Sequence, residues 1–167
     1  MRKLLVLALV MAAVAASAVC ADVKPNPIFS DNAVLQRNTV IPVWGTANSG
    51  ERVTVEFCGQ TRSTVAQNGK WMVRLKPLKE GGPFNMTIKG KNTLEIKNVL
   101  VGEVWVASGQ SNMVWWVKNT ENAEKVIAAS TDPLLRHTEV PRVSSERPVS
   151  ETPIVWNEAS PQTTGDF

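Results

Sequence analysis

Residues 34–97 alternate between hydrophobic and polar positions, and short turn sequences interrupt the alternation. A period of two is typical of β-strands that bury one face and expose the other. The pattern predicts strands within 41–44, 52–57, 71–76, 84–88 and 94–96. Short strands at this spacing favour an antiparallel β-sandwich of about 75 residues.

The breaks between these strands contain residues that favour tight turns. Asn68-Gly69 supplies the positive φ angles of a hairpin turn, and Cys58-Gly59 and Gly81-Gly82-Pro83 mark further breaks. Trp44 and Trp71 lie in predicted strands and allow two interpretations. A tryptophan in a small sandwich is more often part of the core, but its ring is also suited to stacking on a sugar.

The pattern changes after Asn98. Residues 99–107 form a nearly continuous apolar run, typical of a strand covered on both faces, and they lead into the polar segment 108–113. Helical spacing follows within 119–130, and 134–140 predicts another strand. Strand, helix and strand in this order predict a βαβ unit, in which the two strands are parallel.

In such a unit Ser111 lies just beyond the carboxyl end of the first strand, where open α/β sheets place reacting groups. Gly109 permits a sharp turn that would present the Ser111 hydroxyl, and a backbone N–H at this turn could hold an oxyanion. Because a serine in a polar turn is more often only a turn residue, these residues alone leave catalysis as one of two interpretations.

The first 21 residues have the order of a secretory signal peptide. A basic start, 1–3, precedes the apolar run 4–16, and small residues follow. The run is shorter than the roughly 20 residues that a membrane-spanning helix needs. Cleavage could follow Ala18 or Ala21, and we favour Ala21 because a polar, proline-containing segment then begins the mature chain. The sequence therefore predicts a secreted or periplasmic protein.

Cys20 raises a rival interpretation, a lipoprotein anchor. Val19 precedes it where a small Gly, Ala or Ser is expected, so we favour the secreted form. Cleavage after Ala21 would leave Cys58 as the single cysteine of the mature chain. Cys58 ends a predicted strand, and we expect it to be a buried thiol.

Composition and charge exclude several classes of protein. The chain of 167 residues is 43% hydrophobic and 20% charged, which is close to globular averages and disfavours a disordered chain. Loss of Arg2 and Lys3 with the signal lowers the formal net charge from +3 to +1, so no nucleic-acid partner is predicted. A single histidine and two cysteines predict neither a metal site nor a disulfide scaffold.

Residues 101–113, with the sequence Val-Gly-Glu-Val-Trp-Val-Ala-Ser-Gly-Gln-Ser-Asn-Met, resemble the signature of the sialate O-acetylesterase family. This family belongs to the SGNH-type (GDSL-like) carbohydrate esterases. The similarity continues through further short segments, namely 29–37, 42–45, 69–71, 132–133, 140–142 and Trp156. It therefore covers nearly all of the chain after the signal, and it implies that the βαβ unit opens an SGNH-type α/β hydrolase domain.

The resemblance implies removal of O-acetyl groups from sialic acid or related acetylated glycans, with Ser111 as the nucleophile. The N–H of Ser111 would also donate to the oxyanion. Gln110 and Asn112 would belong to the substrate loop. Trp115 and Trp116 would either form an apolar wall for the substrate or pack beneath the loop. This chemistry requires no metal and no organic cofactor.

The resemblance also implies residues that this sequence lacks. The family's histidine and aspartate form an Asp-x-x-His block farther downstream, and Val114 stands where an acidic residue is common. His137, the single histidine, has Leu134 three residues before it and lies in a predicted strand, where we expect its neighbours to satisfy it. The stretch 99–167 is also too short for a complete doubly wound domain.

We therefore expect a fragment, inactive alone, with a signal peptide at 1–21, a β-sandwich domain at 22–98 and an incomplete esterase domain at 99–167. Its partner would be an acetylated glycan, with no membrane span and no oligomeric state indicated. The alternative is a secreted non-catalytic module that binds sugars or other proteins.

Overall fold

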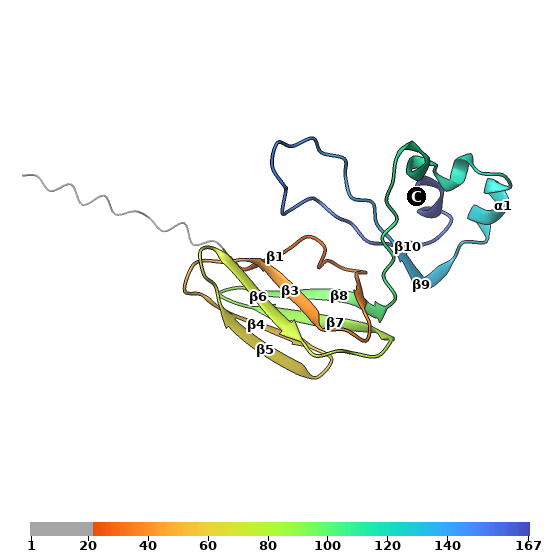
Figure 1. The fold of residues 1–167 in the computed structure, drawn as a ribbon. Helices are drawn as coiled ribbons and strands as arrows, with labels where there is room; N and C mark the ends of the chain where they lie inside the picture. Colours follow the sequence, from red (N-terminus) through yellow and green to blue (C-terminus); the bar gives the residue numbers. More distant parts are fainter. Residues whose placement is uncertain (1–21) are drawn as a thin grey trace, which may run out of the picture.

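The structure is a computed structural model, and it describes residues 22–167. The predicted signal segment, with both cleavage positions and Cys20, lies outside the described residues. Two β-sheets occupy the part of the chain up to residue 102, and short helices, two short strands and long loops follow (Figure 1).

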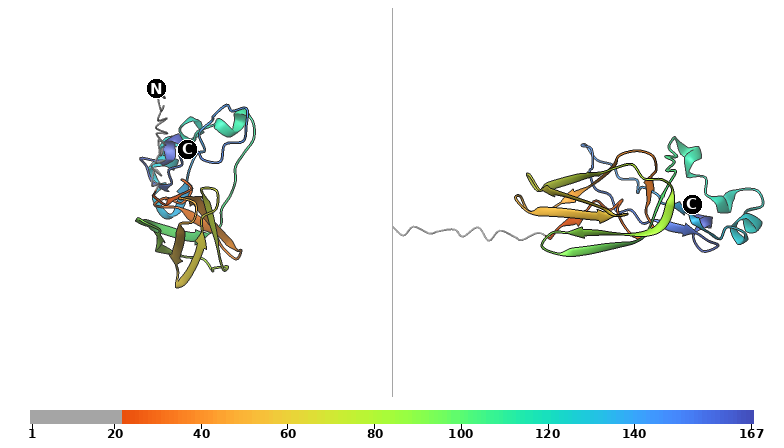
Figure 2. Two further views of the ribbon diagram at one scale, coloured as in Figure 1. Left: turned by 90° about the vertical axis from the view of Figure 1, so that its left-hand side faces the viewer. Right: turned by 90° about the horizontal axis from the view of Figure 1, so that it is seen from below.

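The first sheet contains three strands in the order β1 (Lys24–Pro25), β3 (Ile41–Thr46) and β6 (Lys70–Leu75). The second contains five in the order β2 (Val34–Gln36), β8 (Thr93–Gly102), β7 (Gly81–Lys89), β4 (Arg52–Phe57) and β5 (Gln60–Val65). The paired strands of both sheets are antiparallel except β2 and β8, which are parallel. We call β1–β8 the two-sheet unit; Figure 2 shows its strands from two further sides.

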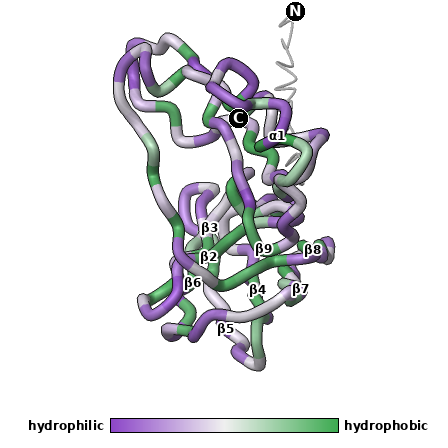
Figure 3. The backbone as a smooth tube through the Cα atoms, turned by 90° about the vertical axis from the view of Figure 1, so that its right-hand side faces the viewer, coloured by the Kyte–Doolittle hydropathy of each residue, from purple (hydrophilic) through white to green (hydrophobic). Residues whose placement is uncertain are grey.

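Alternate residues of the two sheets meet in one hydrophobic core. β4 buries Val53, Val55 and Phe57, while β6 buries Val73 and Leu75, and residues of both sheets belong to the same buried cluster. Figure 3 shows hydrophobic stretches along several strands of the two-sheet unit. Full burial of each such side chain contributes about 1.5–3 kcal/mol, so this core is the main source of the unit's stability.

The two tryptophans of the first sheet have different surroundings. Trp71 is buried in the core, and its Nε1 donates a hydrogen bond to the Thr46 carbonyl at 3.0 Å. Trp44 points to the outer face of the sheet, where it is half-buried and meets Phe29 edge-on, with ring centroids 4.7 Å apart. Trp44 is therefore the more exposed of the two rings.

Four of the predicted turn residues adopt the left-handed conformation, whereas Gly81-Gly82-Pro83, which was predicted as a break, begins strand β7. Cys58 and Gly59 have φ angles of 47° and 73° and join β4 to β5. Asn68 and Gly69, with φ angles of 51° and 77°, form the expected tight turn, but the strands beside it, β5 and β6, belong to different sheets. The Cys58 thiol is free and half-buried, and burial raises its pKa.

The strand that leads toward Ser111 differs from its prediction. β8 runs from Thr93 to Gly102 without a break, so it crosses the predicted boundary between 98 and 99. The apolar residues 104–107 lie outside any strand, and the side chains of Trp105 and Val106 are 89% exposed. No strand among the described residues pairs with this segment, which explains why its apolar side chains stay in solvent.

The remaining elements are short. They are the 3-10 helices η1 (Ser111–Val114), η2 (Val117–Asn119) and η3 (Thr164–Asp166), the helix α1 (Ala123–Ala128), and the strands β9 (Asp132–His137) and β10 (Asn157–Ala159). The predicted parallel βαβ pair is not formed within residues 22–167, because β9 pairs with β10, and does so antiparallel. Asn157 of β10 lies opposite His137 of β9, and no β8–β9 pairing exists in this range.

Candidate active site

Ser111 is the first residue of η1, and an extended segment connects it to the end of β8. Gln110 precedes the helix in an extended conformation, with φ −97° and ψ −154°. Because the first N–H groups of a helix have no acceptor within the helix, the Ser111 N–H is available to a ligand. Both the hydroxyl and the amide of Ser111 therefore stand at an exposed helix start.

Gly109 is required for a close approach rather than for a positive φ angle. A Cβ atom at this position would lie 2.7 Å from Cγ of Met113, whose side chain folds back over Gly109. The N–H of Met113 donates to the Gln110 carbonyl at 2.9 Å, which closes the turn. The glycine predicted to shape this turn therefore does so by leaving room for Met113.

The side chains around the Ser111 hydroxyl leave it unactivated. Ser111, Gln110 and Asn112 are all exposed, and none of their side chains makes a hydrogen bond to another described residue. A serine hydroxyl is a weak nucleophile until an adjacent base accepts its proton. The segment 22–167 thus presents a serine but places no base against it.

The two tryptophans after η1 lie in different environments. Trp115 is 66% exposed, and its Nε1 donates to the Asn119 carbonyl at 3.1 Å. Trp116 is half-buried, with Nζ of Lys118 over its ring at 4.3 Å from the centroid. Lys118 is held in turn by Asp166 at 2.6 Å. Exposure of Trp115 suits an apolar wall beside the loop, whereas the contacts of Trp116 suit packing.

His137 ends β9 and is buried against the last residue of the chain. Its ring centroid lies 4.5 Å from that of Phe167, and burial lowers its pKa. Its Nε2 atom is buried without a hydrogen-bond partner in the described part of the chain, so the expectation that neighbours satisfy it is wrong for this atom. His137 makes no hydrogen bond to Ser111.

A charged network at the exit of β8 was not anticipated from the sequence. Nε of Arg37 donates to Glu103 at 2.5 Å, and its Nη1 contacts Glu80 at 3.0 Å. Gln36 binds Glu103 with its amide nitrogen at 2.9 Å and accepts the N–H of Val104 with its amide oxygen at 2.8 Å. Hydrogen bonds from Gln36 and Arg37 lower the pKa of Glu103. The network fixes the first residues of the segment that leads to Ser111.

A second polar cluster joins β9 and β10 to the two-sheet unit. The Arg136 side chain is only 2% exposed, and its Nη2 lies 3.1 Å from Glu158 and donates a hydrogen bond to the side-chain oxygen Oδ1 of Asn98 at 3.2 Å. Asn98 donates in turn to Glu158 at 2.6 Å and to Asn32 at 2.7 Å. Nε and Nη1 of Arg136 are buried without partners in the described chain.

Trp156, which is part of the family resemblance, also connects the segment before β10 to the two-sheet unit. Its Nε1 donates to the carbonyl of Ile28 at 3.0 Å, and its own carbonyl accepts from the Asn32 amide at 3.3 Å. Residues 29–37 and Trp156, which stand far apart in the sequence, therefore meet in the structure.

Two further features, a cluster of metal ligands and a membrane-spanning helix, are absent from residues 22–167. Between residues 22 and 167, no three side chains of His, Cys, Asp or Glu come together as a metal site would require. None of the helices in the described chain has the length and apolar character needed to cross a membrane.

Comparison with known proteins gave consistent matches, although no family model matches the chain. It is 40% identical to the sialate O-acetylesterase of Rattus norvegicus over 98 residues, which is 52% of this chain and 18% of that protein. It is 34% identical to the sialate O-acetylesterase of Homo sapiens over 113 residues, 60% of this chain and 22% of that protein. The chain thus spans about a fifth of the length of these relatives.

A solved structure gives a match over more of the chain. A carbohydrate acetylesterase from Xanthomonas citri is 34% identical and superposes with a TM-score of 0.85, covering 87% of this chain and 34% of that one. At this identity the likeness concerns both sequence and fold, and it extends over the two-sheet unit and the elements that follow it.

Proposed function

Because this chain belongs to the sialate O-acetylesterase family, we propose that it is part of a secreted carbohydrate esterase. The esterase removes O-acetyl groups from sialic acid or related glycans and uses Ser111 as its nucleophile. The observation that carries the proposal is the presentation of Ser111, whose hydroxyl and N–H both stand free at the start of η1. The order of residues 1–21 supports secretion.

The proposed chemistry is an acyl transfer in two steps. The Ser111 Oγ attacks the acetyl carbonyl, a base accepts the hydroxyl proton, and the sugar oxygen leaves with a proton as the acetyl-serine ester forms. Water then attacks that ester, and acetate leaves while Ser111 regains its proton. In this proposal the Ser111 N–H donates a hydrogen bond to the oxyanion that develops in both steps.

The base comes from outside the described residues in this proposal. His137 is the single histidine of the sequence, and it is enclosed by β9 and Phe167 rather than placed beside the exposed Ser111 hydroxyl. We therefore expect residues 1–167 alone to lack esterase activity that depends on Ser111. The exposed apolar residues 104–107 support the same view, since further polypeptide could cover them.

The test is a chimaera that joins this chain to the part of the Xanthomonas citri acetylesterase that has no counterpart here. We expect it to hydrolyse p-nitrophenyl acetate and an O-acetylated sialic acid. Ser111→Ala should lower kcat by about a thousandfold or more, because removal of a catalytic serine has effects of this order. Ser144→Ala, at an exposed serine in the loop before β10, is the matched control and should leave kcat unchanged.

Two results would contradict the proposal. If the chimaera is equally active with and without Ser111→Ala, Ser111 is not the nucleophile. Enzyme-like hydrolysis by residues 1–167 alone, lost on Ser111→Ala, would show that the base lies within this chain.

A further inference from the structure

A groove on the two-sheet unit lies between β5, at the edge of the five-stranded sheet, and β6, at the edge of the three-stranded sheet. Its volume is about 380 Å³, which lies in the range of small-molecule sites. The residues that matter for its chemistry are Trp44, Thr64, Val65, Gln67, Lys70 and Met72. The edge position leaves the groove open along its length.

The floor of the groove is apolar and held in place. Trp44 on β3 and Met72 on β6 lie directly opposite each other in the sheet register, and both point to its outer face. The ring of Phe29 meets Trp44 edge-on and restrains the indole. Met72 and Val65 remain 41% and 43% exposed. This floor suits the apolar C–H face of a pyranose ring, which packs on indole and aliphatic surfaces.

The rim of the groove supplies polar groups that nothing else engages. The Thr64 hydroxyl, the Gln67 amide and the Lys70 ammonium make no hydrogen bond or ion pair with the rest of residues 22–167. Gln67 and Lys70 flank the Asn68-Gly69 turn, and their backbones exchange hydrogen bonds at 2.9 and 3.0 Å. Because Gln67 and Lys70 are partners across the turn, their side chains leave the same face of the backbone, and an amide and an ammonium are both donors for an anionic oxygen.

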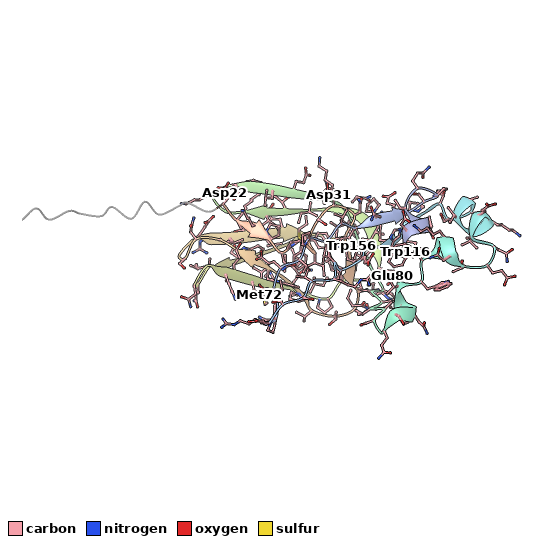
Figure 4. All side chains as sticks on the ribbon, turned by 90° about the horizontal axis from the view of Figure 1, so that it is seen from above. Asp22, Asp31, Met72, Glu80, Trp116 and Trp156 are labelled. Carbon is pink, nitrogen blue, oxygen red and sulfur yellow. The ribbon has the colours of Figure 1, made fainter. Side chains whose placement is uncertain are left out.

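We propose that this groove binds a pyranose that carries a carboxylate, with the ring on Trp44 and Met72 and the carboxylate at Lys70. Hydroxyl groups of the sugar then bond to Thr64 and Gln67. The site does not rest on the esterase proposal, because it uses none of the residues near Ser111. In Figure 4, Met72 lies with Asp22 at one end of the molecule, and Trp116 lies beyond the other end of the two-sheet unit.

The test is a titration of the isotopically labelled chain with 3′-sialyllactose, followed by the amide chemical shifts of β5 and β6. We expect shifts at residues 64–72 and a Kd of about 1 mM, as an open groove of this kind would give. Lactose, which lacks the carboxylate, and a glucuronic acid oligosaccharide, which carries a different acidic pyranose, are the comparison ligands. Lactose should bind at least about tenfold more weakly.

Variants assign the contacts. Lys70→Gln should weaken sialyllactose binding about tenfold and leave lactose binding unaffected, and Met72→Ala should weaken both ligands about threefold. Lys76→Gln is the matched control, because Lys76 is exposed, directly follows β6 and lies outside the groove. Ser111→Ala should bind normally, which separates this site from the esterase. Amide spectra of each variant verify folding.

Three outcomes would overturn the proposal. These are shifts that map outside residues 64–72 and 44–46, equal affinity for lactose and sialyllactose, and unchanged affinity on Lys70→Gln. Binding of the glucuronic acid oligosaccharide at the same residues would support the carboxylate requirement and identify the shared chemistry rather than sialic acid itself.

Discussion

The His137 ring is enclosed at the end of β9, and one of its nitrogens is buried with no partner in the described chain. Burial disfavours the charged imidazolium, which is why the pKa of His137 lies below its ordinary value of 6.5. Protonation of His137 is therefore linked to the packing of the Phe167 ring against the end of β9.

This coupling predicts how stability depends on pH. Below about pH 6.5 the unfolded chain takes up the proton more readily than the folded chain, so His137 lowers stability as pH falls from the unfolded pKa toward the folded one. Above that window it has no effect. His137→Gln should therefore reduce the loss of unfolding free energy between about pH 7.5 and about pH 5, because the variant has no imidazole to protonate.

Urea unfolding of both proteins at the two pH values, followed by tryptophan fluorescence, measures this difference. An identical pH dependence for His137→Gln and the parent would show that the histidine titrates equally in both states.

Among the elements, β9 and β10 depend on one buried guanidinium for their attachment to the two-sheet unit. Arg136 reaches Asn98 and Glu158, and two of its three nitrogens have no partner between residues 22 and 167. A buried charge that loses a partner is costly, whereas replacing the charge by an apolar side chain of similar size is often tolerated.

We therefore predict an asymmetry between the two members of this ion pair. Glu158→Gln should destabilise the protein by about 1–3 kcal/mol, because it removes the countercharge of Arg136. Arg136→Met should cost less. The unfolding free energies, measured in urea, decide the order, and Glu146→Gln at an exposed site is the control. A larger loss for Arg136→Met would mean that the guanidinium is a net source of stability.

Which strands could be predicted from the sequence, and which could not, has a physical cause. Strands such as 52–57 and 71–76 were predictable because period-two alternation records which face is buried. β2 and β10, with three residues each, are too short to show a period, and their pairing with β8 and β9 depends on long-range contacts.

The candidate site also has features that the sequence predicts and features that it does not. The position of Ser111 after an apolar run was visible in the sequence, but its helix start and the role of Gly109 were not. The Arg37–Glu103 pair was missed because its members are 66 residues apart. Family roles of Ser111, Gln110 and Asn112 remain predictions.

For the whole molecule, the notable property is apolar surface near the candidate site. Trp105, Val106 and Trp115 lie within six residues of Ser111 in the sequence, and all three are more than 60% exposed. Residues of this kind gathered in one region favour association with other polypeptides.

We predict that residues 22–167 self-associate and that Trp105→Lys reduces this association. The charged side chain should prevent burial of the segment against a second molecule. Sedimentation velocity over a range of protein concentrations measures the effect, and Val65→Thr, at an exposed apolar residue of β5, is the control. The same degree of association in Trp105→Lys and the parent would place the contact elsewhere.

The course of β8 has a consequence for anyone who recombines proteins of this kind. One strand begins at Thr93 inside the two-sheet unit and ends at Gly102, and the Arg37–Glu103 pair then secures the exit. A crossover placed at 98/99 would divide β8, so that its first half would come from one parent protein and its second half from the other. A crossover after Val104 would transfer the strand and its clamp together, so the natural module for exchange ends several residues later than its composition suggests.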